Sequence, residues 1–275
     1  MYGNGRDVGN MRRYRAVSVE ILLYCLSVVL FCGIGSAEHA PWDCLECGRT
    51  GSTRNYCGGC GHPAPWMKES FETIGNIVRF GHYEQDNCLD NGQEEIEWIV
   101  LDVQEGKSLL LSKYGLDAKA YNATLSDVTW ETCTLRNWLN SAFLNAAFSL
   151  EEQFAILKTD VSNSRNQGYS GYNTSGGNTT KDQIFLLSYQ EAYWRYLKNN
   201  DERVCLLTDF ANGHNDNIEA NGRTQGAWWL RSPGFHFKRA MLIGASGSGT
   251  TDDLVDRASV FVRPALWINL DSDIF

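Results

Sequence analysis

Two stretches near the C-terminus decide the fold: WWLRSPG at residues 228–234 and VRPALWIN at residues 262–269. Each is a short run rich in Trp, Leu, Val or Ile beside turn-forming residues, which indicates β-strands. Similar runs at residues 240–243 and 258–262, with Gly-, Ser- and Asp-containing loops between them, predict a sheet. Because side chains alternate between the faces of a strand, we expect one of the adjacent Trp228 and Trp229 to face the core and the other to face outward.

Each of the two stretches carries one arginine, Arg231 or Arg263, among apolar neighbours. A charge in such surroundings needs a fixed partner, so we expect the two guanidinium groups to link strands and loops through carboxylates or carbonyls. Candidate carboxylate partners are Asp253, Asp256 and Glu131. Binding of a ligand by these arginines is the alternative.

The chain upstream supplies more strands and then helices. Runs at residues 77–81, 97–103 and 107–112 indicate strands, and the last two pair across the Glu105-Gly106 turn. Apolar residues at helical spacing mark residues 132–148, and capping boxes at residues 149–152 and 188–191 open two further helices, the second after an apolar strand at 184–187. Residues 163–180, rich in Asn, Gly, Ser and Thr, predict a long loop. Residues 71–275 therefore form one α+β domain with sheet strands from both ends.

Composition excludes several classes of protein. The 275 residues are 43% hydrophobic and 12% aromatic, so the chain can bury a core and is not disordered as a whole. The net charge of −9, with no basic block in the C-terminal two-thirds, argues against a nucleic-acid partner, since phosphate binding needs clustered positive charge.

Residues 1–37 have the pattern of a signal peptide or a membrane anchor. Arg6, Arg12, Arg13 and Arg15 precede an apolar run that ends in small residues. The charge-free part, residues 21–37, is short of the roughly 20 residues that a spanning helix needs, so both alternatives stay open. If uncleaved, the segment attaches the protein to a membrane, and the basic flank places the C-terminal domain outside.

Residues 38–66 contain two Cys-x-x-Cys-Gly motifs and a proline-containing linker. Tetrahedral zinc needs four ligands that converge on one point, and two such turns supply them from the arms of a hairpin. The pattern resembles a zinc ribbon and predicts a structural zinc ion held by Cys44, Cys47, Cys57 and Cys60. Two disulfides, which export permits, are the alternative.

The combination of motifs also resembles a family. EWIVL at 97–101, LLLSKY at 109–114, TLRNWLN at 134–140 and IFLLS at 184–188, with WWLRSPG and VRPALWIN, look like a bacterial domain family of unassigned function over residues 71–275. The last two motifs are also similar to C-type-lectin-like folds, including the formylglycine-generating-enzyme group and the variable proteins of diversity-generating retroelements. The resemblance implies a C-type-lectin-like mixed α+β fold.

The functional motifs of those relatives are missing. Formylglycine-generating enzymes act through a cysteine pair near the C-terminus, whereas no cysteine follows Cys205 here. The Glu-Pro-Asn, Gln-Pro-Asp and Trp-Asn-Asp triplets of calcium-dependent lectins do not occur. Pairing Cys205 with His214, or Cys133 with any histidine, has no supporting signature, so we assign no catalytic residues.

The loop at residues 233–239, together with residues 245–256, combines aromatic, charged and small residues, as recognition surfaces do. The predicted ligand-binding residues are Trp229, Arg231, Phe235, His236, Phe237, Lys238, Arg239, Asp252 and Asp253. Asp252, Asp253 and Asp256 form either a hard-cation site or, as we favour, a solvated loop. We therefore expect a non-catalytic module that recognises a protein or glycan at the cell envelope, secreted or membrane-anchored. The alternatives are an envelope-acting hydrolase or modifying enzyme, and a membrane-anchored zinc-ribbon adaptor facing the cytoplasm.

Overall fold

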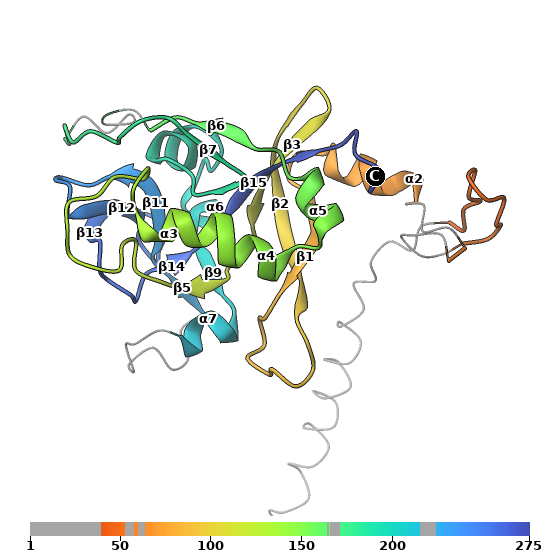
Figure 1. Cartoon of the computed structure of the whole chain (residues 1–275), viewed down its shortest axis with the longest axis horizontal. Coiled ribbons are helices and arrows are strands. Elements are labelled where there is room, and N and C mark those ends of the chain that lie inside the picture. Colours follow the sequence, from red (N-terminus) through yellow and green to blue (C-terminus); the bar gives the residue numbers. More distant parts are fainter. Residues whose placement is uncertain (1–39, 53–57, 60–63, 164, 166–170, 215–223) are drawn as a thin grey trace, which may run out of the picture. The chain divides into compact units, whose positions relative to one another are not determined.

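The computed structural model describes residues 40–52, 58–59, 64–163, 165, 171–214 and 224–275 (Figure 1). The chain divides into two compact units, Met1–Arg54 and Asn55–Phe275. The predicted leader, residues 1–37, lies outside the described residues. Within the described part, no helix combines the length and the apolar character needed to cross a membrane. The second unit mixes several sheets with a few short helices, which confirms the predicted α+β class.

The first sheet joins the two ends of the second unit. Its order is β1-β2-β3-β15-β8, and all its neighbours are antiparallel. Gly106, with φ of +67°, turns the chain between β2 and β3 and completes the predicted hairpin. The C-terminal strand then lies beside β3, with Trp267 opposite Leu109. The strands are β1 (Ile77–Tyr83), β2 (Glu94–Gln104), β3 (Lys107–Ser112), β8 (Ile184–Phe185) and β15 (Ala265–Asn269).

The second sheet is built around the WWLRSPG stretch. Its order is β13-β12-β11-β14-β5. The central strand β11 runs antiparallel to β12 and parallel to β14. Figure 1 shows β11, β12 and β13 at the opposite side of the domain from β1, β2 and β3. The strands are β5 (Asp117–Ala118), β11 (Trp228–Pro233), β12 (Arg239–Ile243), β13 (Thr250–Leu254) and β14 (Phe261–Val262).

The remaining strands form two smaller sheets. One has the order β10-β9-β4, and the other pairs β6 with β7 across the segment predicted as a long loop. Their bounds are β4 (Tyr114–Gly115), β6 (Thr159–Val161), β7 (Thr180–Asp182), β9 (Cys205–Leu207) and β10 (Gln225–Gly226).

Two of the helical segments begin at the capping boxes that the sequence predicts. Ser149 and Glu152 form both hydrogen bonds of a capping box at α5, and Ser188 and Glu191 exchange the same two bonds at η2. The helical stretch expected at residues 132–148 is continuous, but its middle turn is π-helical. The helices are α2 (Pro65–Phe71), α3 (Thr134–Trp138), η1 (Leu139–Phe143), α4 (Leu144–Ala147), α5 (Leu150–Ala155), η2 (Gln190–Arg195), α6 (Asn200–Arg203) and α7 (Asp209–Gly213).

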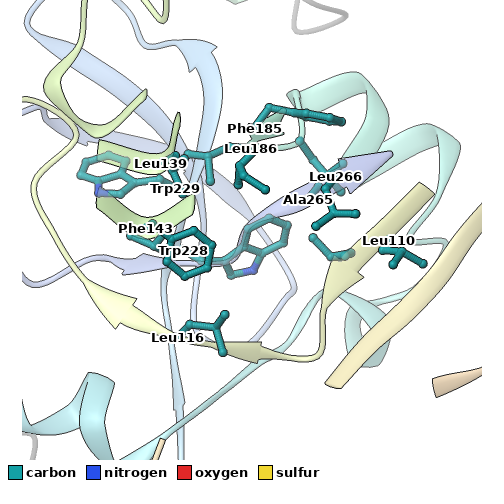
Figure 2. Packing of buried hydrophobic residues seen from close by; sticks show 14 of the residues in the cluster. Leu110, Leu116, Leu139, Phe143, Phe185, Leu186, Trp228, Trp229, Ala265 and Leu266 are labelled. Carbon is teal, nitrogen blue, oxygen red and sulfur yellow. The ribbon is translucent and has the colours of Figure 1, made fainter. Parts of the chain in front are cut away.

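Both tryptophans of the WWLRSPG stretch are buried, with exposed fractions of 0%, so the expectation that one faces outward is wrong. The reason is that β11 is a central strand that is covered on both faces. The indole N–H of Trp228 donates to the Arg203 carbonyl, and that of Trp229 donates to the Lys119 carbonyl, both at 2.9 Å. Figure 2 shows the two rings pointing into different parts of the packed interior.

The two arginines do link distant segments, but not through the expected carboxylates. Arg231 pairs with Glu191, and its guanidinium group also donates to the backbone carbonyls of Ser162 and Leu186. Arg263 donates to the Ser112 carbonyl at 2.9 Å and lies over the Trp228 ring. Glu131 instead accepts from Asn178. Sequence position could not reveal Glu191 as the partner, because it lies forty positions before Arg231, with the helices α6 and α7 between them.

Candidate functional site

The turn between β11 and β12 carries the most exposed of the predicted ligand-binding side chains. The Gly234 N–H donates to the Arg239 carbonyl at 2.8 Å and closes the hairpin. Between them, Phe235 is 64% and Phe237 is 40% exposed. We call the side chains of Phe235, His236, Phe237 and Lys238, which are all exposed, the hairpin tip.

Asp252 on β13 holds the hairpin tip in place. It is 9% exposed, and its carboxylate accepts from the Phe235 N–H at 2.5 Å and from Arg239 Nε at 2.9 Å. Gly234 must be a glycine here, because a Cβ would lie 2.6 Å from the Asp252 carboxylate. Asp252 and Arg239 therefore shape the surface from beneath, whereas the sequence predicted them as direct ligand contacts.

Segments from elsewhere in the chain pack against the tip. The Tyr172 ring lies edge-on to Phe235 with 5.9 Å between ring centroids, and Thr174 Oγ1 donates to the Phe235 carbonyl at 2.8 Å. On the other side, the Val128 N–H donates to the Phe237 carbonyl at 3.0 Å. Sequence reasoning missed Tyr172, since it falls in a polar stretch with no periodicity to mark it.

The structure separates the two loops that the sequence grouped. Strand β12 joins them, so the turn at residues 244–249 lies at the far end of that strand from the hairpin tip. There the Gly247 carbonyl accepts from Arg203 Nε at 2.9 Å. Only the β13 end of residues 245–256 adjoins the tip, through the Val255 N–H and the Lys238 carbonyl.

The other predicted site residues lie beneath the surface or point elsewhere. Trp229 is fully buried and Arg231 is 4% exposed, so neither contributes to an exposed patch around the tip. Asp253 is half-buried and pairs with Arg257 at 3.3 Å. Because Asp252 and Asp253 turn toward different arginines, their carboxylates do not converge as cation ligands would.

A pocket of about 410 Å³ opens over the Arg231–Glu191 pair. It combines hydroxyl, amide, charged and aromatic side chains from η2 and two flanking segments. Its lining residues are Ser162, Ser188, Gln190, Glu191, Trp194, Arg195 and Arg231. No sequence motif identified it, and only the capping box at residues 188–191 marked the start of its helix.

The cysteines of the domain core are unsuited to nucleophilic catalysis. Burial raises the pKa of the Cys133 thiol to about 12 and that of the Cys205 thiol to about 11, so both are protonated near neutral pH. His214, considered as a partner for Cys205, instead places Nδ1 3.2 Å from Asp117. Asp117 also accepts from Tyr83 at 2.9 Å, and burial followed by this carboxylate raises the pKa of the tyrosine.

A second acidic group lies between the loop after β1 and the start of β2. Carboxylate oxygens of Glu84, Asp86 and Glu94 lie within 4.8 Å of one another. Each accepts hydrogen bonds from the loop itself, including those from the Cys88 and Gln85 N–H groups. These hydrogen bonds give the three carboxylates a structural role, which is to hold the conformation of the loop.

The structure describes one of the two Cys-x-x-Cys-Gly motifs, the one at Cys44 and Cys47 in the first unit. Trp42 and Ser52 form an isolated antiparallel bridge around the Cys44–Cys47 turn. In that turn the Gly48 N–H donates to the Cys44 carbonyl at 2.9 Å, and Gly48 has φ of +71°. This is a tight Cys-x-x-Cys-Gly turn that suits thiolate ligands. Cys57 and Cys60 lie outside the described residues.

These observations define an α+β domain with an exposed aromatic turn and a separate polar pocket. A family described as a domain of unknown function, DUF6273, matches residues 105–270, more than half of the chain, and the chain belongs to that family. Its match covers both deciding stretches, as the sequence resemblance to such a family predicts. No curated protein and no solved structure matches the chain.

Proposed function

We propose that residues 71–275 act as a non-catalytic binding module that recognises a protein or glycan at the cell envelope through the hairpin tip. The observation that carries the proposal is the pair of exposed rings, Phe235 and Phe237, on a turn fixed by the buried Asp252. Exposed aromatic side chains held in one conformation lose little entropy on binding, as in known recognition surfaces. The envelope location rests on the signal or anchor pattern of residues 1–37.

The test compares retention of the full chain on purified cell-wall sacculi and on immobilised envelope membranes. The double substitution Phe235→Ala and Phe237→Ala is expected to abolish retention. Phe154→Ala is the matched control, because it removes an 85% exposed ring from helix α5, which is not part of the hairpin tip. Equal retention of all three proteins, or none for the wild type, contradicts the proposal.

We also propose that Cys44, Cys47, Cys57 and Cys60 hold a structural zinc ion. The tight turn at Cys44–Cys47 supports it, since Cys-x-x-Cys turns of this kind supply two of the four ligands in structural zinc sites. One zinc per chain in the purified protein, lost when Cys47 is replaced by Ser, is the expected result. Zinc-free protein whose thiols resist alkylation until reduced favours the two disulfides instead.

The C-type-lectin-like fold is a further part of the proposal. A sheet that joins the N-terminal hairpin β2–β3 to the C-terminal strand β15, with a second sheet around β11, supports it. An experimental structure whose strand order departs from that of C-type-lectin-like domains would reject this assignment.

One observation favours the enzyme alternative. His214, paired with Asp117, and Lys119 line a hollow of about 540 Å³, an arrangement that suits a general base. If the protein hydrolyses or modifies envelope material, His214→Ala should abolish the reaction. A topology reporter fused after Phe275 distinguishes both functions from a cytoplasmic adaptor, because only the adaptor places that fusion inside the cell.

A further inference from the structure

We propose that the pocket over the Arg231–Glu191 pair, here called the Trp194 pocket, binds one unit of a neutral saccharide. This inference rests on the proposed binding function and names a ligand class for a second place on the same domain. Its volume of about 410 Å³ falls at the small end of the roughly 300–1,000 Å³ typical of small-molecule sites.

One wall of the pocket is the exposed indole of Trp194, which neighbouring aromatic rings contact. Trp194 is 61% exposed, although a large aromatic ring normally gains from burial. Its ring lies edge-to-face with Tyr193 at 5.3 Å, and Tyr193 stacks on Tyr189 at 5.3 Å. The Arg203 guanidinium lies 4.2 Å from the centroid of the Tyr193 ring and fixes it further. The negative face of such an indole attracts the weakly positive C–H groups on one side of a sugar ring.

The floor of the pocket is a pre-organised carboxylate. Arg231 is 4% exposed and donates to the Ser162 and Leu186 carbonyls as well as to Glu191. The Glu191 side chain remains 26% exposed, so it can be reached from the pocket. Its Oε1 accepts from Arg231 Nη2 at 2.8 Å, and a carboxylate oxygen can accept a second bond. A sugar hydroxyl would find there an acceptor that is partly buried and already oriented by Arg231.

The local helix brings the remaining groups to the same side. In the π-helical turn η2, residues four or five apart share a face, which places Gln190 and Glu191 beside Trp194 and Arg195. Gln190 and Arg195 add an amide and a guanidinium to the rim. The pocket thus offers donors, acceptors and one flat apolar surface.

Charge and polarity exclude other ligand classes. The Arg231 and Glu191 charges cancel, and Arg195 lies 3.3 Å from Asp102, so the pocket has little net charge. A phosphate group would meet the Glu191 carboxylate, and an ammonium group would meet two guanidinium groups. A wholly apolar ligand would cover Ser162 and Ser188 without bonding to them, which costs free energy. A neutral polyhydroxyl ring satisfies both the polar floor and the aromatic wall.

The test uses the full chain, purified in a detergent without a sugar headgroup, in calorimetric titrations. The probes are neutral trisaccharides of α- and β-linked glucose, mannose, galactose and N-acetylglucosamine, with inorganic phosphate for comparison. We expect at least one trisaccharide to bind with a millimolar or lower Kd. Trp194→Ala should weaken that binding about tenfold or more, while Trp194→Phe keeps most of it. Because Trp194 is exposed, its loss should leave the urea unfolding curve unchanged.

The outcomes separate this inference from the proposed function. Phe154→Ala, and the double substitution of Phe235 and Phe237, should leave the saccharide Kd unchanged. Absence of saccharide binding across the panel overturns the inference, as does phosphate binding that Trp194→Ala removes. The inference is also overturned if saccharide binding is lost in the Phe235 and Phe237 variant but not in Trp194→Ala. In that case the hairpin tip is still supported as a binding surface. If the wild-type protein is not retained on envelope material but still binds a saccharide, the proposed function of the hairpin tip is rejected. The inference about the Trp194 pocket then stands.

Discussion

The Asp252 carboxylate on β13 accepts a hydrogen bond from the Phe235 backbone N–H at 2.5 Å, across the width of β12. The same carboxylate accepts from Arg239 Nε at the other end of the turn. One buried side chain therefore fixes both ends of the segment that exposes Phe235 and Phe237. Thr174 and Val128 add hydrogen bonds to the backbone of the turn, and the Tyr172 ring packs against Phe235.

Replacing Asp252 by Ala should destabilise the protein by about 2 kcal/mol, because it removes two bonds and leaves Arg239 without its carboxylate. Urea unfolding measures the change. Asp160→Ala is the control, since its ion pair with Lys181 is exposed on both sides and should contribute about 0.5 kcal/mol or less. Equal effects of the two substitutions would contradict the role assigned to Asp252.

Gly234→Ala should lower the free energy of unfolding by about 1–3 kcal/mol and reduce envelope retention. The added Cβ would lie 2.6 Å from the Asp252 carboxylate and 2.8 Å from the Arg239 backbone. Gly249→Ala is the matched control, because its Cβ meets nothing within 4 Å. Thermal unfolding of the two variants provides the comparison. A stable Gly234→Ala protein with normal retention would show that the tip tolerates another conformation.

The Glu191–Arg231 pair should make stability depend on pH. Burial alone would raise the pKa of Glu191, but the Arg231 charge and the hydrogen bonds from Arg231 and Ser188 outweigh it and hold the pKa below its ordinary value of 4.5. A folded pKa below the unfolded one means that the ion pair stabilises the protein above the unfolded value. This stabilisation is lost as the pH falls through 4.5 toward the folded pKa.

Urea unfolding at neutral pH and at about pH 3 should therefore show a smaller difference for Glu191→Gln than for the wild type. At neutral pH the same substitution should lower the free energy of unfolding by about 3 kcal/mol, since it leaves the Arg231 charge buried without a counter-charge. Identical pH profiles would mean that Glu191 has the same pKa in the folded and unfolded states.

The buried thiols should resist alkylation in the native protein. Burial raises the pKa of Cys133 to about 12 and that of Cys205 to about 11, so almost no thiolate forms at about pH 8. Cys88 is exposed and should react with iodoacetamide before Cys133 and Cys205. Peptide mass spectrometry, with and without urea, measures the order. Rapid native labelling of Cys133 or Cys205 would indicate an open or reactive site that the structure does not contain.

Local features were predictable because the residues that form them are close in sequence. The β2–β3 hairpin needs only a glycine that can adopt φ of +67° between two apolar strands. The capping box of α5 needs Ser149 and Glu152, three residues apart. The tip residues Phe235 and Phe237 stood out by composition alone, and the structure leaves both exposed.

The site as a whole was less predictable, because its supports come from distant segments. Tyr172 and Thr174 reach the hairpin tip from a stretch without a periodic pattern. The bonds of Asp252 to Phe235 and Arg239 were unpredictable for a related reason: a surface loop and a buried anchor have the same acidic composition. The grouping of residues 233–239 with 245–256 overlooked that a hairpin strand sends its two ends in opposite directions.

By itself, the sequence determined the α+β class, the membership of a domain family, the positions of about half of the strands and the starts of α3, α5 and η2. These depend on periodicity, on turn chemistry and on motifs a few residues long. Only the tertiary structure decided that both Trp228 and Trp229 are buried and that Arg231 meets Glu191. Both outcomes depend on which strands become neighbours of β11, and that choice is made by packing over the whole core.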